Sequence, residues 1–223
     1  MILLVGYDYR NREKAWETLA SYVEQGGSLF VDTGWQFAVA EWQFDQAPEV
    51  LPVSRLTWTD YGMTDEYSLD FIDIAGEVDV SLFKPLVWEG QAWQLSGAQP
   101  EEVRDWGRVV LSANGRPLIV AGEYGEGRVV WSGMNLINHA MYLGQNEEEI
   151  LLLNNLLAWT IAGRQRQELA PPSVERIHPD RVSLAFGPAS DNNTWLYWRE
   201  AYYPNWHAYL IDGIDRRELP IYR

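Results

Sequence analysis

Residues 2–31, ILLVGYDYRNREKAWETLASYVEQGGSLFV, contain the pattern that decides the fold class. The apolar run at residues 2–5 predicts a buried strand, and residues 28–31 predict a second one. Residues 11–25 between them have helical spacing, and Gly26-Gly27 ends the helix because glycine tolerates the left-handed conformation. The apolar face of this helix consists of Trp16, Leu19, Ala20 and Val23. Such a β-α-β unit of about 30 residues indicates parallel strands joined by a right-handed crossover.

The next segment, residues 36–95, has a weaker pattern. A short helix is predicted over residues 37–44, before the prolines at 48 and 52 interrupt it. Strand-like runs follow at residues 67–74 and 78–83. Acidic residues cluster from Asp60 to Asp79.

Clearer signals return after residue 107. Strands are predicted at residues 108–111, 117–123 and 128–132, separated by the turn Asn114-Gly115 and the hairpin Tyr124-Gly125-Glu126-Gly127. Asn146 is a predicted helix N-cap, and three glutamates follow it where the helix dipole favours anions. This helix extends to about Ala162. Its predicted packing face consists of Ile150, Leu153, Leu157 and Ile161.

The pattern divides the chain into two domains. Residues 1–165 are predicted to form an α/β domain with an open, mostly parallel, flavodoxin-like sheet flanked by helices. Residues 166–173 have no apolar face and are interpreted as a linker. Residues 174–223 contain only strand signals, at 181–186, 194–198 and 206–211, and predict a small antiparallel β appendage at the C-terminus.

Composition excludes several classes of function. The formal net charge is -15, so the surface repels phosphate backbones and anionic lipids, and we expect no nucleic-acid partner. The chain contains no cysteine, which excludes thiolate metal sites and cysteine nucleophiles. No apolar stretch reaches the ~18 residues of a membrane span, so we expect this segment itself not to insert into a membrane.

No motif for a cofactor or metal is present. The glycines at 122, 125 and 127 lie between strands and lack dinucleotide-binding spacing. Acidic residues 60–79 could hold a cation but lack the EF-hand spacing, which favours a solvated acidic face. The histidines at 139, 178 and 207 are too far apart in sequence for a typical zinc site. We therefore predict neither cofactor nor metal, and leave the cation question for residues 60–79 open.

Six residues are candidate ligand-binding groups. In an open α/β sheet, ligands bind at the carboxyl ends of the parallel strands. The first strand brings Asp8 and Tyr9 to that edge, the second brings Asp32 and Trp35, and a later strand brings Asn135 and His139. Carboxylates beside aromatic rings suit hydroxyl-rich or cationic ligands. The alternative is that Asp8 and Asp32 only cap neighbouring turns or helices.

Two further hypotheses use other side chains. Ser132 and His139 form the one nucleophile–base pairing in the sequence that merits consideration, although no third group is identifiable to orient the histidine. The twelve tryptophans suit stacking on sugars or protein interfaces as well as core packing. Core positions are predicted for Trp16, Trp131 and Trp159, and loop positions for Trp35, Trp42, Trp58 and Trp93.

Residues 1–163 resemble the class I glutamine amidotransferase-like fold. The resemblance rests on residues 20–35 and on residues 117–133, PLIVAGEYGEGRVVWSG. It implies a cysteine nucleophile with a histidine and a nearby glutamate. The cysteine is missing, His139 lies roughly at the histidine position, and Met141 stands where the glutamate belongs. The resemblance therefore implies an amidotransferase-like scaffold, catalytically degenerate and without catalytic residues.

Residues 173–223 resemble the extracytoplasmic β domain of bacterial multi-spanning membrane proteins of the glycosyltransferase-like type. Some of these proteins carry the label 6-pyruvoyl-tetrahydropterin-synthase-related. The resemblance rests on residues 198–209, WREAYYPNWHAY, and on Asp212-Gly213 and residues 220–223. It implies a location on the extracytoplasmic face of a bacterial membrane, within a larger protein, and a β domain that continues past Arg223. The isolated fragment is expected to be soluble.

The two resemblances together imply a non-catalytic ligand-binding or assembly module of a bacterial membrane protein. Its expected partners are the parent membrane protein or that protein's assembly partners. A glycan or another hydroxyl-rich molecule is the small-ligand alternative. A degenerate hydrolase using Ser132 and His139, and a carbohydrate-binding module using loop tryptophans, are the rival functions.

Overall fold

The structure is a computed structural model that describes most of the chain. It describes residues 1–5, 11–34, 44–60, 66–88, 91–92, 94–142, 146–162, 172–178, 181–185 and 206–219. The chain divides into two compact units, Met1–Arg164 and Gln165–Arg223. Each unit is described by itself below.

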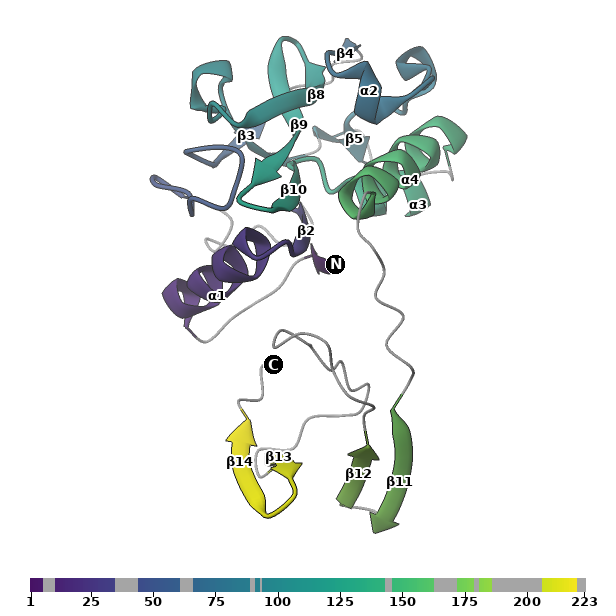
Figure 1. Cartoon of the computed structure of the whole chain (residues 1–223). Helices are drawn as coiled ribbons and strands as arrows, with labels where there is room; N and C mark the ends of the chain where they lie inside the picture. The colour runs from purple at the N-terminus through teal and green to yellow at the C-terminus, as the bar shows by residue number, and fades with distance from the viewer. Residues whose placement is uncertain are drawn as a thin grey trace. The chain divides into compact units, whose positions relative to one another are not determined.

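The larger unit is built on a six-stranded sheet of order β1-β2-β10-β9-β8-β4 (Figure 1). Its strands are β1 (Ile2–Val5), β2 (Ser28–Asp32), β4 (Tyr67–Leu69), β8 (Gly107–Ala113), β9 (Arg116–Tyr124) and β10 (Gly127–Ser132). β2 pairs in parallel with both β1 and β10, whereas β10–β9, β9–β8 and β8–β4 are antiparallel. The α/β class is therefore confirmed, but the expectation of a mostly parallel sheet is wrong.

Two tight turns explain why the sheet is mixed. Asn114 and Gly115 have φ angles of 49° and 73° and join β8 to β9, while Gly125 at φ 60° lies between β9 and β10. A short loop of this kind can only join antiparallel neighbours, since a parallel pair needs a long crossover. Both hairpins are predicted from the sequence and are confirmed, and parallel pairing is confined to β2 with its two neighbours, β1 and β10.

The two strands of the N-terminal β-α-β unit differ in how far they are buried. All five residues of β2 are buried. β1 forms as predicted but is an edge strand, and its Leu3 side chain is 45% exposed, so the prediction of a buried strand is wrong for this position. An edge strand has a neighbour on one side only, which leaves part of its surface uncovered.

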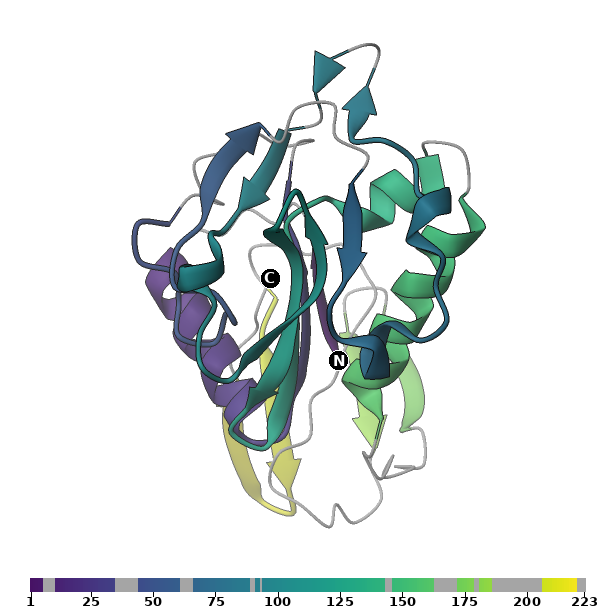
Figure 2. The same ribbon diagram turned by 90° about the horizontal axis from the view of Figure 1, so that it is seen from above.

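Helices cover both faces of the sheet, α1 on one side and α4 on the other (Figure 2). Side chains alternate along a strand, so Leu29, Val31 and Trp131 pack toward α1 (Arg12–Glu24). Phe30 and Val130 pack toward the opposite side, which carries α2 (Ile72–Ala75), α3 (Leu136–Tyr142) and α4 (Glu147–Ile161).

The predicted end of α1 at Gly26 and the predicted N-cap of α4 at Asn146 are confirmed, and the structure also shows an N-cap at Asn11. Asn11 Oδ1 accepts the Lys14 backbone N–H at 3.0 Å and begins α1. Gly26, with φ 91°, follows the helix and allows its left-handed exit. Asn146 Oδ1 accepts the backbone N–H groups of Glu148 and Glu149, each at 3.0 Å, and begins α4.

The buried face of α4 is rotated from the predicted one. Its buried residues are Glu149, Leu152, Leu153, Leu156 and Thr160. Ile161, predicted to pack, is 50% exposed. The prediction counted apolar residues only, whereas polar contacts at both ends of this helix set its rotation. Thr160 O accepts a hydrogen bond from Ser28 at one end, and Glu149 is fully buried at the other.

Short elements surround the main sheet of the larger unit. β3 (Thr57–Asp60) pairs with β7 (Gln94–Gly97), and β5 (Val87–Trp88) pairs with β6 (Gln91–Ala92). Two 3-10 turns, η3 (Val80–Leu82) and η4 (Pro100–Glu102), complete it. The predicted strand at 67–74 is wrong beyond Leu69, because α2 follows, and the one at 78–83 is a 3-10 turn instead. Residues 37–43 of the predicted short helix lie outside the described residues, and Phe44 pairs with Leu56 in an isolated bridge.

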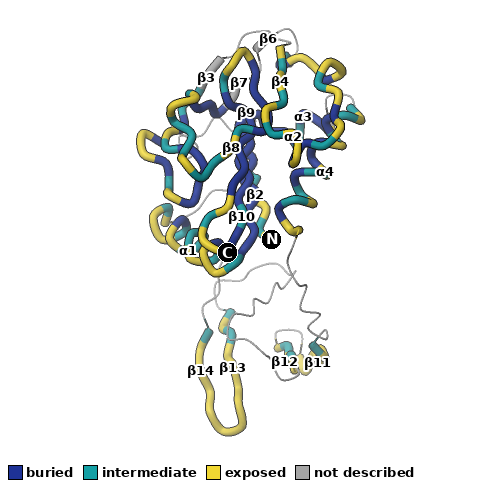
Figure 3. Tube along the Cα trace, turned by 45° about the horizontal axis from the view of Figure 1, so that its top comes forward, coloured by how far each residue is buried: buried dark blue, intermediate teal, exposed yellow. Residues whose placement is uncertain are grey.

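The described residues of the smaller unit form two antiparallel strand pairs. β11 (Ser173–His178) pairs with β12 (Arg181–Ala185), and β13 (Ala208–Asp212) pairs with β14 (Asp215–Leu219). Figure 3 shows these strands as largely exposed, in contrast to the buried central strands of the larger unit. The predicted strand at 194–198 and linker residues 166–171 lie outside the described residues. In the part of the chain that the structure describes, no helix combines the length and the apolar character needed to cross a bilayer.

Candidate functional site

Polar side chains meet at the carboxyl ends of β2 and β10. Asp32 and Ser132 are register partners in this parallel pair, so their side chains lie on the same face of the sheet, toward α3. The exposed fractions are 1% for Asp32 and 0% for Ser132. The two groups are therefore in the interior, where every polar atom needs a partner.

Asp32 uses its carboxylate to cap helix α3. One oxygen, Oδ1, accepts the Leu136 backbone N–H at 3.0 Å, and Oδ2 accepts the Ile137 N–H at 2.9 Å. Burial raises the pKa of Asp32 to about 6. The backbone hydrogen bonds from Ile137 and Leu136, the nearby Ser132 hydroxyl and the field of His139 oppose that rise. Asp32 thus acts as the cap that the sequence left as an alternative to ligand binding.

Ser132 is a buried hydroxyl whose side chain lacks a hydrogen bond. Among the described residues, its Oγ has no partner within normal hydrogen-bond geometry, although it lies close enough to Asp32 to influence the pKa of that carboxyl. Its backbone carbonyl is engaged, because it accepts the Thr33 N–H at 2.7 Å. An activated nucleophile needs a base in hydrogen-bond reach of its hydroxyl, and Ser132 has no such contact with His139.

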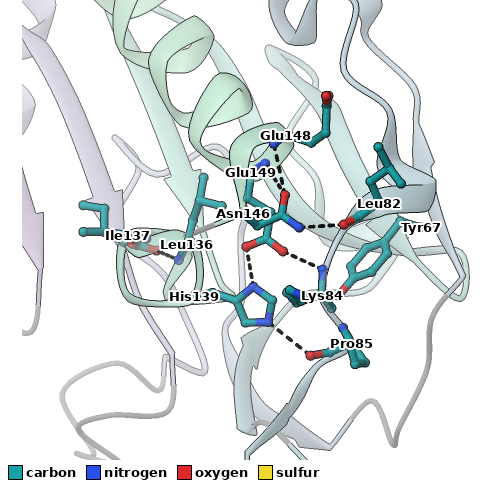
Figure 4. Close-up of polar contacts among 11 residues, drawn as sticks. Tyr67, Leu82, Lys84, Pro85, Leu136, Ile137, His139, Asn146, Glu148 and Glu149 are labelled. Atoms are coloured by element: carbon teal, nitrogen blue, oxygen red, sulfur yellow. Dashed lines mark hydrogen bonds and ion pairs between the residues drawn. The ribbon is translucent and has the colours of Figure 1, made fainter. Parts of the chain in front are cut away.

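His139 instead pairs with a glutamate that sequence reasoning did not consider (Figure 4). Its Nδ1 lies 2.6 Å from Glu149 Oε2, and both side chains are 0% exposed. Its Nε2 lies 3.2 Å from the Pro85 carbonyl oxygen. The second carboxylate oxygen, Glu149 Oε1, accepts the Lys84 backbone N–H at 2.7 Å. Both ring nitrogens of His139 therefore have partners.

Hydrogen-bond chemistry fixes the proton arrangement of this pair. The Pro85 carbonyl can only accept, so we assign the donor hydrogen to His139 Nε2. One more proton then lies between Nδ1 and Glu149 Oε2, and the pair is neutral overall whichever atom carries it. In a serine-type triad, the nitrogen opposite the carboxylate faces the nucleophile and accepts its proton. Here that nitrogen donates to a backbone carbonyl, so His139 is not available as a base.

The same end of α4 holds the chain segment Asp79–Pro85. Asn146 Nδ2 donates to the Leu82 carbonyl at 2.6 Å, and Glu148 Oε2 accepts the Asp79 N–H at 2.9 Å. Together with the Glu149 contact to Lys84, these bonds satisfy backbone groups of an irregular segment (Figure 4). These polar contacts therefore hold α3, α4 and the segment Asp79–Pro85 together.

The structure locates three of the six predicted binding residues. Asp32, Asn135 and His139 are all buried, and they are linked through the start of α3, where the Asn135 carbonyl accepts the His139 N–H at 2.9 Å. Asn135 adopts φ 52°, and its Oδ1 accepts the Asn138 side-chain amide at 2.6 Å. Asp8, Tyr9 and Trp35 lie outside the described residues.

Glu149 is the residue that sequence reasoning missed. It was interpreted as one of three glutamates that favour the start of a helix. The sequence does contain a signal for its burial. Residues 149, 152, 153, 156 and 160 share one face of the helix, and apart from Glu149 and Thr160 the residues on this face are leucines. A carboxylate on a buried face requires a partner, but the pattern does not indicate which residue that partner is.

Several other candidate groups have ordinary structural roles. Among the described residues, no group of three or more histidine or acidic side chains is placed to hold a metal ion. Within the acidic stretch, Asp70 accepts the Ser112 hydroxyl at 2.8 Å, and Asp79 Oδ1 accepts the Ser81 N–H at 3.0 Å.

The tryptophans are divided between core and surface layers. Trp16 and Trp131 are buried, as predicted, and Trp159 packs partly buried beneath the Arg128 guanidinium, which lies 4.9 Å from the ring centroid. Trp58 lies in strand β3 and not in a loop, so that prediction is wrong. Trp35, Trp42 and Trp93 lie outside the described residues.

An open groove lies on the other side of the sheet, against helix α1. It has a volume of about 870 Å³ and is bounded by α1, by residues 44–49 and by Tyr124. We call it the α1 groove. Its lining combines aromatic rings with an excess of carboxylates, and Asp32, Asn135 and His139, the predicted binding residues that the structure describes, do not contribute to it. It is therefore separate from the sealed cluster at the strand ends.

Comparison with known proteins gives no family assignment. No protein-family model matches the chain, and no curated protein matches it. Among solved structures, the cytoplasmic protein STM3548 from Salmonella typhimurium is similar at 20% identity and a TM-score of 0.46, over 66% of this chain and 60% of that one. The cytoplasmic protein STM1381 from Salmonella typhimurium LT2 is similar at 17% identity and a TM-score of 0.37, over 64% of this chain and 60% of that one. The chain thus spans about 60% of the length of these two structures.

Proposed function

We propose that this chain is a non-catalytic ligand-binding or assembly module. The observation that carries the proposal is the burial of the polar cluster of Asp32, Ser132, His139 and Glu149, which is the candidate active site among the described residues. Asp32 caps a helix, His139 is held between Glu149 and a backbone carbonyl, and Ser132 has no base. All of these side chains are buried, so a substrate has no path to them in this arrangement.

The proposed origin of the two units follows from the two resemblances in the sequence. The larger unit would be a degenerate relative of the amidotransferase-like scaffold, and the smaller one part of an extracytoplasmic β domain of a bacterial membrane protein. The missing cysteine and the structural use of His139 are consistent with a scaffold that has no activity. Its partners would then be the parent membrane protein or that protein's assembly partners, with a hydroxyl-rich ligand such as a glycan as the small-molecule alternative.

One observation favours the rival function of a degenerate hydrolase. The contact of 2.6 Å between His139 and Glu149 has the form of the histidine–carboxylate half of a catalytic triad. The other half is not assembled, because Nε2 is directed at Pro85 and not at Ser132. For this reason we place the hydrolase second. For a carbohydrate-binding module, the described tryptophans offer little, since Trp16 and Trp131 are buried.

A turnover assay tests the proposal. The purified chain is incubated with glutamine, with release of ammonia as the readout, and with p-nitrophenyl esters of two to eight carbons. We expect rates that equal those of Ser132→Ala and His139→Gln, because neither side chain can act as nucleophile or base. Turnover that disappears in Ser132→Ala, with an unchanged circular dichroism spectrum, would establish the hydrolase instead.

A topology experiment tests the location. In the parent gene, alkaline phosphatase or green fluorescent protein is fused directly after the region that encodes residue 223. We expect phosphatase activity and no fluorescence, because phosphatase is active only outside the cytoplasm. The opposite pattern would refute the extracytoplasmic assignment without affecting the conclusion on catalysis.

A further inference from the structure

Strand β1 leaves an apolar edge of the main sheet open. Among the described strands, β1 has a neighbour on one side only, which is β2. Its residues Ile2–Val5 are all apolar and include no charge or proline, which are common protections of a sheet edge. Leu3 and Phe30 are register partners, so both side chains point to the face of the sheet that α4 covers. Phe30 is fully buried whereas Leu3 is 45% exposed, so the cover stops short of β1.

The flank of α4 on the β1 side is apolar and incompletely covered. On the opposite flank, Asn155 Nδ2 donates to the Ala75 carbonyl of α2 at 2.6 Å. Because α2 contacts β8 while α4 packs on β2 and β10, the α2 flank faces away from β1. The other flank carries Ile150, Leu157 and Ile161 at helical spacing. Ile161 is 50% exposed and the other two are only partly buried, so this flank has apolar surface to cover.

The open strand edge and the helix flank meet at one place. The Ser28 hydroxyl donates to the Thr160 carbonyl at 2.7 Å, which joins the beginning of β2 to the end of α4. β1 starts beside this point, because its first residue pairs with the second residue of β2. Figures 1 and 3 likewise show the N-terminus of the chain next to the C-terminal end of α4. The two features therefore form one apolar surface, which we call the β1–α4 edge: Ile2–Val5, Ile150, Leu157 and Ile161.

The composition of α4 indicates that its outer surface is covered. Residues 150–162 contain no charged side chain, although charged residues make up 22% of the chain. A helix that is apolar on all sides is typically buried on all sides. The apolar spacing in the sequence predicts a packing face that includes Ile150, Leu157 and Ile161, yet the residues buried within the chain lie on a rotated face. Burial of the β1–α4 edge by another molecule accounts for this difference.

We propose that the β1–α4 edge binds a second copy of the chain, with the two β1 strands paired antiparallel about a twofold axis. An open strand edge pairs with another strand, and an uncharged apolar surface suits an occupant of the same kind. β1 itself provides both. With the axis perpendicular to the sheet, Leu3 lies opposite its counterpart in the other copy, and both α4 helices lie on one face of a continuous sheet. The net charge of -15 opposes association, but the β1–α4 edge itself carries no carboxylate.

Sedimentation equilibrium of the full chain tests the self-association. We expect a reversible monomer–dimer equilibrium with a dissociation constant of roughly 10–100 µM, because two short strands and a helix flank bury less area than a standard interface. The dimer should strengthen as salt rises, since salt screens the repulsion between the two acidic chains. A chain that stays monomeric up to millimolar concentration at high salt would overturn the proposal. Association that weakens with salt would also overturn it, because the contact would then depend on charge attraction.

Matched lysine variants locate the contact. Leu3→Lys and Ile161→Lys each place a charge in the β1–α4 edge, whereas Ile72→Lys makes the same change at a 64% exposed residue of α2, on the other flank of α4. We expect the dissociation constant to rise about tenfold or more for the first two variants, because the contact buries an unpaired ammonium group. The control should change it less than about twofold. Urea midpoints establish that the three variants are folded, and equal dissociation constants in all three would overturn the site.

A disulfide cross-link tests the twofold pairing of β1. The chain contains no cysteine, so a single introduced cysteine can only join two copies. Residues directly opposite in an antiparallel pair have Cβ atoms about 4.5–5.5 Å apart, close to disulfide distance. Under mild oxidation, we expect Leu3→Cys to form a covalent dimer about tenfold faster or more than Leu82→Cys, an exposed control in η3. Equal rates would overturn the pairing. The self-association goes beyond the proposed function, and its failure leaves the turnover result intact, so the two proposals fail separately.

Discussion

Asp32 combines an unfavourable environment with a necessary role. Its carboxyl is 1% exposed, yet it is the group that accepts the first two N–H donors of helix α3. Removing a carboxylate from water disfavours its charged form, and two backbone N–H groups recover only part of that cost. Its pKa of about 6 is the result. A polar residue at the end of a central strand can therefore be costly and still be required, because the helix start would otherwise be left without acceptors.

This balance predicts a specific pH dependence. The pKa of Asp32 rises from 3.8 to about 6 on folding, so the folded state binds the proton more tightly. Protonation of Asp32 therefore stabilises the folded state at low pH, by about 3 kcal/mol in total. This stabilisation is lost as the pH rises from about 4 to 6, and it is absent at higher pH. We expect the free energy of unfolding of the natural chain, minus that of Asp32→Asn, to fall by ~2 kcal/mol between pH 4.5 and 7.5.

Urea denaturation across that pH range measures the difference. The variant removes the titration while its amide oxygen keeps one of the two N–H acceptor contacts, so its other effects give an offset that does not vary with pH. Subtraction also cancels the other carboxylates. A difference that is constant from pH 4.5 to 7.5 would show that Asp32 titrates normally.

The first turn of α4 links three parts of the larger unit. Asn146, Glu148 and Glu149 cap their own helix or hold the segment Asp79–Pro85, and Glu149 also engages His139 of α3. Glu147, which lies between Asn146 and Glu148, is exposed and makes none of these contacts with the described residues. The four consecutive polar residues 146–149 therefore contribute very differently to the stability of the fold, and their residue types alone do not show which of them contribute most.

A comparison of Glu149 variants tests this element. Glu149→Ala leaves the His139 ring and the Lys84 N–H without their partner in the interior, and we expect a loss of ~3 kcal/mol or more in unfolding free energy. Glu149→Gln should lose much less, because its amide can donate to Nδ1 of neutral His139 and accept from Lys84. Glu147→Ala is the matched control and should stay within ~0.5 kcal/mol. Urea midpoints for the three proteins decide, and equal losses for the Ala and Gln variants would contradict the hydrogen-bond account.

At the scale of the whole molecule, the two units differ in how they are stabilised. The larger one has apolar clusters on both faces of its sheet. The described residues of the smaller unit are mostly exposed, including Ile211 of β13 at 67% and Ile214 of the following turn at 102%. Two-stranded hairpins are marginally stable by themselves. The larger unit is therefore expected to resist local opening far better than the smaller one.

Limited proteolysis follows from this division. Residues 163–173 have no apolar pattern in the sequence and connect the two units, so we expect trypsin to cut first at Arg164 or Arg166. Mass spectrometry should then show a persistent fragment that begins at residue 1 and ends at one of these arginines. Early cleavage within residues 1–160, while the connection remains intact, would contradict the division.

The sequence by itself determined the elements with strong local signals. The N-terminal β-α-β unit, the hairpins at Asn114-Gly115 and Gly125-Glu126, and the N-cap at Asn146 all form as the pattern predicts. These features depend on backbone conformation and on hydrogen bonds between near neighbours, which residue type controls directly. The acidic composition likewise follows from the sequence alone.

Only the tertiary structure decided which polar residues are buried and with what partners. Glu149 and His139 are ten residues apart, and Glu149 and Lys84 are 65 apart, so no local pattern connects them. The share of parallel pairing, the exposed edge at Leu3 and the rotation of α4 depended on how the sheet and helices pack together. Burial and long-range pairing are properties of the assembled chain, and they turned the expected strand-end binding residues Asp32 and His139 into internal hydrogen-bond partners.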